Sequence, residues 1–469
     1  MFPLMRLPDE LILHVINAVH PADIESLVLC NKTMYAFANK AFIYHQMLKE
    51  ICSEIVLDDP PDEELVTDDC SPFTLIENFR WDTELVYYPR TLSIGDYYAL
   101  DPEEPWVPGE WADLELATNN SIISDASHKY IQICPFLEDQ EKDEWCAGLC
   151  KPGNLSISTA LMFALLPNIS SVSIHHWYQW PTGSDRIWKI VERIANVNRN
   201  INSHWKGKAL SCLRKFNIEF EDDQFWDSSN IQVLIPFAML PSMRCLYGVN
   251  IRARSSLDSP PAISWPTDFP LGASTVTKLH FTHSSVDVHN FSLFLAGFAA
   301  LQDFRYRHEG DGVNGAIYKP WIIIDALKAN SSASLQKLDM TANQDGLSNE
   351  DKAGQYVGSL RSFMVLENIR VDQHIFTCSG SDILARGEEL EGNERLDRLV
   401  DVLPSSVKSL TLTLWIPSGE DRLFSDLAEK RHCLPRLKRI GYTLDREPVD
   451  ATLAKALEDM GILIDWEYD

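Results

Sequence analysis

A short apolar pattern recurs through most of the chain, and this repetition constrains the fold more than any other feature. The pattern, apolar-x-x-apolar-x-apolar, begins again every 25–44 residues. Two apolar residues separated by one other residue point to the same face of a strand, so this spacing is typical of a short strand that buries one face. The nine instances are Ile169-Val172-Ile174, Leu213-Phe216-Ile218, Leu246-Val249-Ile251, Val276-Leu279-Phe281, Leu301-Phe304-Tyr306, Leu335-Leu338-Met340, Leu366-Ile369-Val371, Val407-Leu410-Leu412 and Leu437-Ile440-Tyr442. Weaker instances at 89–94 and 461–468 flank the series.

Amphipathic helix candidates lie between these predicted strands. Residues 185–198 carry Ile and Val at helical spacing, and residues 291–300, 321–329 and 451–460 look similar. A strand that alternates regularly with a helix predicts parallel strands joined by right-handed crossovers. Because the strands are short, a curved solenoid is favoured over a globular doubly wound sheet. The predicted fold class is α/β, with a parallel-stranded solenoid over residues 87–469.

The first fifty residues follow a different, helical periodicity. Pro8 suits the first turn of a helix, and Pro21 can end one helix and begin the next. Three helices in so short a segment are marginal by themselves, so we expect another surface to cover part of their apolar side chains. The apolar residues of the first predicted helix are Leu7, Leu11, Ile12, Val15, Ile16 and Val19.

The segment from Leu7 to Ala38, LPDELILHVINAVHPADIESLVLCNKTMYAFA, resembles an F-box. It has the opening Leu-Pro-x-Glu-Leu, the Asp-Ile-x-x-Leu of the second helix and a polar Cys-Asn-Lys break. It departs from the family pattern at the aromatic residue, often Trp, near the end of the third helix, where Phe42 or Tyr44 stands. The resemblance covers about a tenth of the chain and implies an F-box at residues 1–50.

F-boxes dock on a Skp-family adaptor, which links them to the cullin and RING subunits of a ubiquitin ligase. The series of strands likewise resembles the divergent leucine-rich repeats that follow F-boxes in many fungal proteins. By resemblance, the adaptor-binding residues would be Leu7, Pro8, Leu11, Val15, Ile16, Ile24, Leu27 and Val28.

Residues 51–86 change in composition and are interpreted as an acidic connector. The stretch DDPPDEELVTDDCSP is acidic and contains proline, which is typical of a solvated linker. Phosphorylation at Thr67 or Ser71 is the alternative role for this segment.

Charge and composition exclude several classes of protein. The net charge of −27 disfavours binding to nucleic acid or to an anionic membrane surface. The longest apolar stretch, residues 291–301, is far shorter than the about 20 residues that span a bilayer. The N-terminus lacks the apolar run of a signal peptide, and ten scattered cysteines do not suggest a disulfide framework. We therefore expect a reduced intracellular protein, cytoplasmic, nuclear or both.

Two motifs suggest nucleotide binding and metal binding, but the residues around them do not support either. Residues 310–315 form G-x-G-x-x-G, but the strand before them alternates with charges and the next helix cannot begin until Pro320. The pairs His175-His176 and His280-x-x-His283 lack metal-ligand partners at a suitable spacing. We expect no catalytic residue, metal or cofactor; a nucleotide-dependent enzyme using residues 310–315 is the alternative that cofactor binding would test.

Cations concentrate between the apolar positions of the predicted strands. At these alternating positions we count eleven Lys and Arg against five Asp and Glu, in a chain that is strongly acidic. A chance bias and a basic groove explain this excess equally well; such a groove would bind an acidic or phosphorylated segment. The residues assigned to the groove are Arg252, Lys278, His280, Arg305, Arg307 and Arg370.

Together these features predict a substrate receptor of an SCF-type (Skp–cullin–F-box) ubiquitin ligase. The F-box would hold the adaptor, and the solenoid would hold a protein substrate of unknown identity. The alternative is an F-box or repeat scaffold that acts outside ubiquitination.

Overall fold

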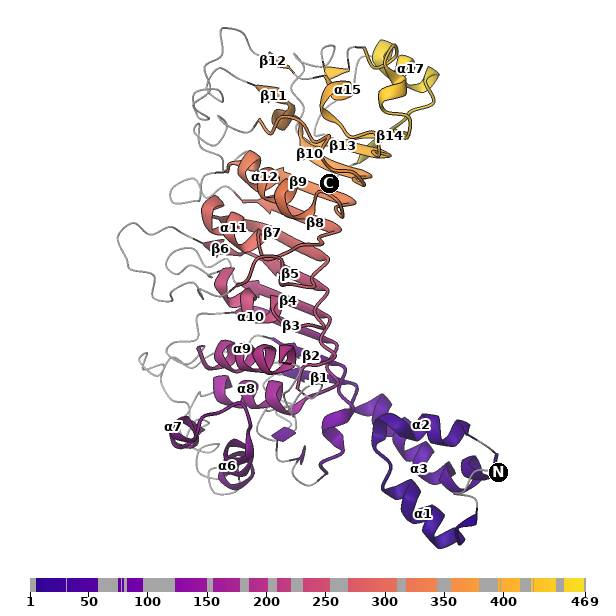
Figure 1. Cartoon of the computed structure of the whole chain (residues 1–469), viewed down its shortest axis with the longest axis vertical. Helices are drawn as coiled ribbons and strands as arrows, with labels where there is room; N and C mark the ends of the chain where they lie inside the picture. The colour runs from indigo at the N-terminus through magenta and orange to yellow at the C-terminus, as the bar shows by residue number, and fades with distance from the viewer. Residues whose placement is uncertain are drawn as a thin grey trace, which may run out of the picture. The chain divides into compact units, whose positions relative to one another are not determined.

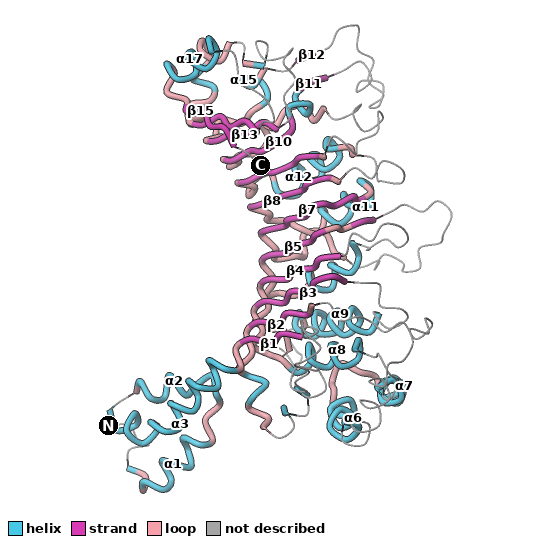
Figure 2. Tube along the Cα trace, turned by 180° about the vertical axis from the view of Figure 1, so that it is seen from behind, coloured by secondary structure: helices cyan, strands magenta, loops and turns pink. Residues whose placement is uncertain are grey.

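Three helices come first, and their apolar spacing is the reason they pack on one another. They are α1 (Asp9–Asn17), α2 (Pro21–Leu29) and α3 (Lys32–Ile51). Asp9 and Glu10 lie in the first turn of α1, where a carboxylate is stabilised by the helix dipole. Ile12, Ile16 and Val28 are buried among them. Figure 2 shows α3 packed alongside the other two helices, forming what we call the three-helix module.

The computed structural model describes most of the chain, with gaps. The described ranges are 6–30, 32–57, 75–76, 78–79, 82–95, 123–149, 155–177, 185–200, 209–220, 231–253, 269–309, 318–343, 356–378, 395–396, 398–413, 423–424, 426–443 and 451–467. The chain divides into two compact units, residues 1–217 with 240–242, and residues 218–239 with 243–469.

The first unit contains the three-helix module and an α/β part. Its strands β1, β2 and β3 pair in parallel. Buried Val172 and Ile174 of β3 alternate with half-buried serines. Besides the module, the elements are β1 (Glu54–Leu57), η3 (Leu85–Tyr87), β2 (Thr91–Ile94), α6 (Ile123–Ile133), α7 (Asp139–Leu149), α8 (Leu155–Leu165), β3 (Ser171–Trp177), α9 (Asp185–Arg199) and β4 (Lys215–Phe220), within which the division between units falls.

Strand β1 lies inside the segment interpreted from sequence as a connector. Ile55 and Leu57 are buried, and the strand is paired with β2 along its length. The sheet therefore begins some thirty residues before the predicted start of the solenoid at residue 87. Thr67 and Ser71 lie outside the described residues.

The three-helix module also contacts the segment before β2. The Nδ1 atom of His45 and the hydroxyl of Tyr88 are joined by a hydrogen bond of 3.0 Å. The rings of His20 and Tyr87 meet edge to face, with centroids 4.1 Å apart. Burial lowers the pKa of His45 and raises the pKa of Tyr88 to about 12, so both groups are neutral in this contact at neutral pH.

The second unit consists of parallel strands with helices along one side. The hydrogen-bonded order is β5, β7, β8, β9, β10, β13, β14 and β15, with β6 beside β7, and every described pairing in this sheet is parallel. A separate antiparallel pair is formed by β11 and β12. These findings confirm the α/β class and the parallel strands predicted from the repeating pattern.

The elements of the second unit follow the same strand-then-crossover order. They are η4 (Ile231–Leu234), α10 (Ile235–Ala238), β5 (Cys245–Val249), β6 (Arg252–Ala253), β7 (Lys278–Val286), α11 (Val288–Leu295), β8 (Asp303–His308), α12 (Pro320–Ser331), β9 (Lys337–Ala342), β10 (Asn368–Asp372), η6 (Gln373–Phe376), β11 (Thr377–Cys378), β12 (Arg395–Leu396), α15 (Leu399–Val402), β13 (Ser409–Thr413), η8 (Arg431–Cys433), β14 (Arg439–Thr443), α17 (Ala451–Asp459) and β15 (Leu463–Glu467).

Aromatic side chains fill the core between the central strands and α11. Figure 1 shows α11 and α12 along one side of β7, β8 and β9. Phe291 of α11 stacks on Phe281 of β7 at 5.7 Å and meets Tyr306 of β8 at 5.0 Å. Because side chains alternate along a strand, the residues between these buried positions face away from the helices. We call this outward side of β7–β10 the charged face.

Candidate docking surfaces

The three-helix module buries several of the residues expected to bind an adaptor. Ile16 and Val28 are 3% and 4% exposed and pack with Ile12, Met34 and Ala38 in one cluster. Ile24 is 7% exposed. Ile16 and Val28 therefore help to hold the module together, because the helices are short enough to need an internal apolar cluster, and Ile24 is buried as well.

The other predicted adaptor residues are accessible to different degrees. Leu7 and Leu11 are 37% and 48% exposed, and Pro8 is also exposed. Val15 and Leu27 are half-buried. The accessible part of the predicted set is thus concentrated at the start of α1.

Large apolar side chains are exposed on the module far more densely than elsewhere in the described chain. Nine of the sixteen exposed large apolar residues lie within residues 7–51. Ile43, Met47 and Ile51 follow one another at intervals of four along α3, so they share one side of the helix. The nine are Leu7, Leu11, Leu13, Leu29, Tyr35, Ile43, Tyr44, Met47 and Ile51. The exposed apolar residues of α3 were not among the adaptor-binding residues predicted from the sequence. The sequence shows that a helix has apolar residues, but it does not show which of them face the inside of the module and which face the solvent.

Strand pairing aligns polar and charged side chains across the charged face. In one line across β5–β10, Tyr247, His280, Arg305, Asp339 and Arg370 are register partners, each with the next. We call this line the central row. Neighbouring strands lie about 4.8 Å apart, so adjacent members of the row are in direct reach of one another.

Asp339 lies between arginines in this row. Its Oδ2 atom is 2.8 Å from Nε of Arg305 and 3.7 Å from a terminal nitrogen of Arg307. Burial raises the pKa of Asp339, and the positive charges of Arg305, Arg307 and Arg370 oppose that rise. Three guanidinium groups thus surround one carboxylate on the sheet.

A second carboxylate, Asp303, binds the basic residues of β7. His280 Nε2 is 2.9 Å from Oδ1 of Asp303, and Lys278 Nζ is 3.9 Å from Oδ2. Burial alone would raise the pKa of Asp303, but the hydrogen bond from His280 and the nearby Lys337 and Lys278 bring it below its ordinary value. His280 is therefore a carboxylate partner in this structure.

The histidine pair at 280 and 283 does not form a shared ligand set. Nδ1 of His283 is 3.3 Å from a carboxylate oxygen of Glu309, whereas His280 binds Asp303. No group of three or more His, Cys, Asp or Glu residues in the described ranges could hold a metal ion. His175 is half-buried on β3, and the side chain of His176 lies outside the described residues.

The placement of Arg252 corrects the predicted groove. In the structure Leu246, not Val249, is the register partner of Leu279, and Gly248 is the partner of Phe281. The expected strand pattern Leu246-Val249-Ile251 was therefore three residues out of register. Arg252 falls on β6 beside Ser285 and outside the central row. The other predicted groove residues, Lys278, His280, Arg305, Arg307 and Arg370, all lie on the outward side of β7, β8 and β10.

Asp372 ends the outward side of β10 but is completely buried. Its Oδ2 atom accepts a 2.8 Å hydrogen bond from the Ala342 backbone N–H, and its Oδ1 atom accepts one from the Thr413 hydroxyl. Burial raises the pKa of Asp372 to about 7, although these two hydrogen bonds oppose the rise. The residue joins β9, β10 and β13 and is not accessible to a ligand.

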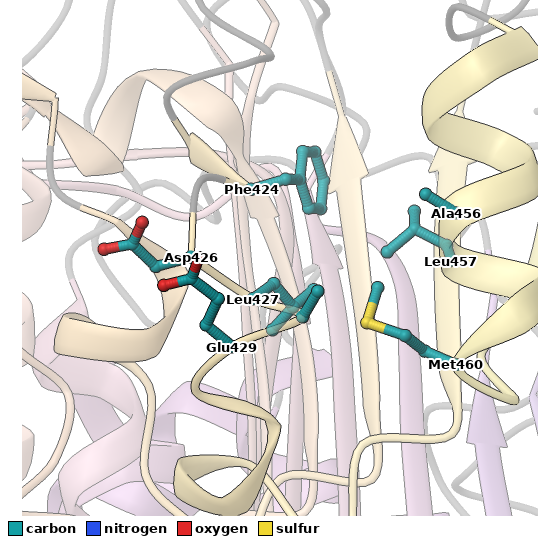
Figure 3. A pocket seen from close by; sticks show the side chains of 8 residues that line it. Phe424, Asp426, Leu427, Glu429, Ala456, Leu457 and Met460 are labelled. Atoms are coloured by element: carbon teal, nitrogen blue, oxygen red, sulfur yellow. The ribbon is translucent and has the colours of Figure 1, made fainter.

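A small hollow near the C-terminus is mainly apolar. Figure 3 shows Phe424, Leu427, Leu457 and Met460 lining it, with the carboxylate of Asp426 at one side. That carboxylate binds Arg398 and, at 3.4 Å, Lys430.

The glycine-rich residues 310–315 lie outside the described ranges.

No model of a known protein family matches the chain, and no curated protein matches it. No helix in the described ranges has both the length and the apolar character needed to span a bilayer.

Proposed function

We propose that this chain is a substrate receptor of an SCF-type ubiquitin ligase. The exposed apolar side of the three-helix module would dock on a Skp-family adaptor, and the α/β part would hold a protein substrate. The receptor contributes no covalent step; it raises the effective concentration of the substrate near the ubiquitin-conjugating enzyme. We place this activity in the cytoplasm or the nucleus.

The observation that carries the proposal is the density of exposed apolar side chains on α1 and α3. Burying such surface in a partner is favourable by roughly 25 cal/mol per Å². An apolar surface of this density marks a protein–protein contact more often than a free surface. The resemblance of residues 7–38 to an F-box supports a Skp-family adaptor as the partner.

The test replaces exposed residues only, because Ile24 is buried and its replacement by Asp would unfold the module. The double variant Leu11→Asp, Ile43→Asp removes one exposed residue from each of the two helices. The matched control is Leu293→Asp, Ile133→Asp. Leu293 is 49% exposed against 48% for Leu11, and Ile133 is 61% exposed against 60% for Ile43.

We expect the first double variant to lose co-precipitation of a Skp-family adaptor, because a buried, unpaired carboxylate costs several kcal/mol. The control pair, outside the module, should retain wild-type binding. Circular dichroism would verify that both variants remain folded. Equal adaptor recovery from both variants would show that this surface does not dock the adaptor.

A further inference from the structure

The hollow between α17 and the turn around Asp426, which we call the C-terminal hollow, is narrow and has an apolar floor (Figure 3). Its volume is about 210 Å³. Phe424, Leu427 and Leu457 line it and are at most 5% exposed, so they form its floor. An apolar cavity of about 150 Å³ stays dry and binds benzene, whereas pockets for drug-sized ligands begin at about 300 Å³. The C-terminal hollow therefore has the size for one large apolar side chain.

Small side chains keep the mouth of the hollow open. Ala428 and Ala456 line the hollow and are exposed, and Met460, which also lines it, is half-buried. Nothing bulkier than a methyl group stands at the two alanine positions. An apolar side chain from a partner can therefore reach the floor, where it makes dispersion contacts that the lining atoms lack without it.

One wall of the hollow is held in a fixed shape. Asp426 has a left-handed backbone with a φ of 60°, which a residue other than glycine keeps only where its surroundings hold it. Its carboxylate binds Arg398 and Lys430, and its carbonyl oxygen accepts a 2.8 Å hydrogen bond from the Lys430 backbone N–H. Because this wall is set beforehand, binding there costs less conformational entropy than ordering a loop would.

Three exposed carboxylates lie at or beside the hollow. Glu429 lines it, with its carboxylate on the same side as that of Asp426 (Figure 3). Glu458 and Asp459 are in the last turn of α17, next to Leu457 on the floor. Glu429, Glu458 and Asp459 form no ion pair within the described part of the chain, whereas Asp426 has two. The helix dipole disfavours carboxylates at the C-terminal end of α17, so a cation bound there would be stabilising.

Basic residues of the same two elements do not balance these carboxylates. Lys430 is engaged by Asp426, which leaves Lys455, one turn before Asp459 on α17 and exposed. Three carboxylates against one lysine leave a negative charge of about two beside the hollow. This charge attracts a basic residue and repels an acidic one.

We infer that the C-terminal hollow binds a segment of the protein substrate in which a Lys or Arg stands close to a large apolar residue. The apolar side chain enters the hollow, and the cation lies among Glu429, Glu458 and Asp459. An acidic residue next to the apolar one is repelled by the same carboxylates, which gives the site its selectivity. This inference names the substrate class of the receptor proposed above and rests on that proposal.

The test uses three peptide arrays with the full-length protein. In the first, each peptide has a fixed Leu, and an Arg is placed in turn at every position within three residues of it. In the second, Glu replaces the Arg, and in the third, Ala replaces the Leu. The remaining positions are randomised among uncharged residues. We expect the strongest retention on the Leu/Arg array, because it alone supplies both the apolar anchor and the cation.

The variant Ala456→Phe fills the hollow from its exposed mouth and leaves the buried floor unchanged. It should bind the Leu/Arg array about tenfold more weakly, as expected when the pocket for an anchor residue is lost. The matched control is Ala147→Phe, which adds the same ring to an exposed alanine of α7 and should bind like the wild type. Urea unfolding would verify that both variants remain folded.

The variant Glu458→Gln, Asp459→Asn tests the charge, because it removes two exposed carboxylates and keeps the side-chain size. The preference for the Leu/Arg array over the Leu/Glu array should fall about threefold, in line with the usual strength of exposed charge pairs. The matched control, Asp143→Asn, Glu144→Gln, changes two neighbouring exposed carboxylates of α7 and shifts the net charge equally. It should keep the wild-type preference.

The outcomes separate this inference from the proposed function. Unchanged binding by Ala456→Phe, or equal retention on the Leu/Arg and Leu/Glu arrays, would overturn the assignment of the hollow. Adaptor co-precipitation is measured on the same variants. Loss of peptide binding with intact adaptor binding supports both statements, whereas binding of the Leu/Arg array by a chain that recovers no adaptor would overturn only the ligase role.

Discussion

At the scale of single residues, Gly248 explains why one strand does not follow the repeating pattern. It occupies an inward position of β5 where the other central strands have a large apolar side chain. A Cβ atom there would lie 2.6 Å from Cγ1 of Ile251 and 3.0 Å from a ring carbon of Phe281. The side chain of Ile251, three residues later, fills the space that Gly248 leaves.

This packing predicts a coupling between the two positions. Gly248→Ala should lower the free energy of unfolding by roughly 1–3 kcal/mol, the usual cost of overpacking a core. In a protein that also carries Ile251→Ala, the added methyl group meets fewer atoms and should cost much less. Urea unfolding of the wild type, both single variants and the double variant measures this. Equal costs of Gly248→Ala in the two backgrounds would refute the coupling.

Asp372 predicts a pH dependence of stability. Its pKa is raised from 3.8 to about 7 in the folded protein, so the folded state holds a proton that the unfolded state releases. The stabilisation from this proton is fully present below about pH 4 and is lost as the pH rises to about 7.

The expected change is measurable with Asp372→Asn, which has no titratable group but can still bond Ala342 and Thr413. From pH 8 to pH 5 the wild type should gain roughly 2–3 kcal/mol of stability relative to this variant. Arg370 and Asp339, whose charges act on the pKa of Asp372, are unchanged in the variant. Denaturant midpoints at both pH values provide the measurement, and parallel pH profiles for the two proteins would contradict the shifted pKa.

At the scale of elements, the sequence pattern predicted most strands because their inward residues are large and regularly spaced. Eight of the nine predicted patterns coincide with β3, β4, β7, β8, β9, β10, β13 and β14, and the two flanking ones with β2 and β15. β5 was misplaced because a glycine stands at an inward position. β1 was missed because it lies next to an acidic, proline-bearing stretch that dominates the local composition.

Helix boundaries and the two candidate docking surfaces were less predictable. The predicted helix at 291–300 is α11 at Val288–Leu295, because the Asp287 side chain accepts hydrogen bonds from the His289 and Asn290 backbone N–H groups and so starts the helix earlier. Sequence placed Arg305, Arg307 and Arg370 on one side of the sheet. It did not show that they share Asp339, since register between distant strands depends on the fold.

At the scale of the whole molecule, parallel strand pairing predicts that the second unit cannot be divided within its sheet. On one side β7 is paired with β5 over Lys278–Thr282; on the other it is paired with β8, with a register shift between Phe281 and Ser284. A cut at about residue 260 would separate β5 from β7 and leave two open sheet edges with exposed apolar residues.

We therefore expect neither residues 1–260 nor residues 261–469 to give a soluble, cooperatively unfolding protein when made alone. The two fragments made together should recover a complex, because their edges are complementary. Thermal unfolding of each fragment and of the pair is the measurement. Cooperative unfolding of both separate fragments would indicate that the sheet is not one structural unit across β5 and β7.

The function proposed for the whole molecule is that of a receptor in a cullin–RING ligase. Affinity purification of the full-length chain from cells, followed by mass spectrometry, tests it most directly. We expect a Skp-family adaptor, a cullin and a RING subunit among the recovered proteins, all absent when the bait carries Leu11→Asp, Ile43→Asp. Recovery of the adaptor without a cullin would place the chain outside ubiquitination, and recovery of no adaptor would show that the chain is not a receptor of this kind.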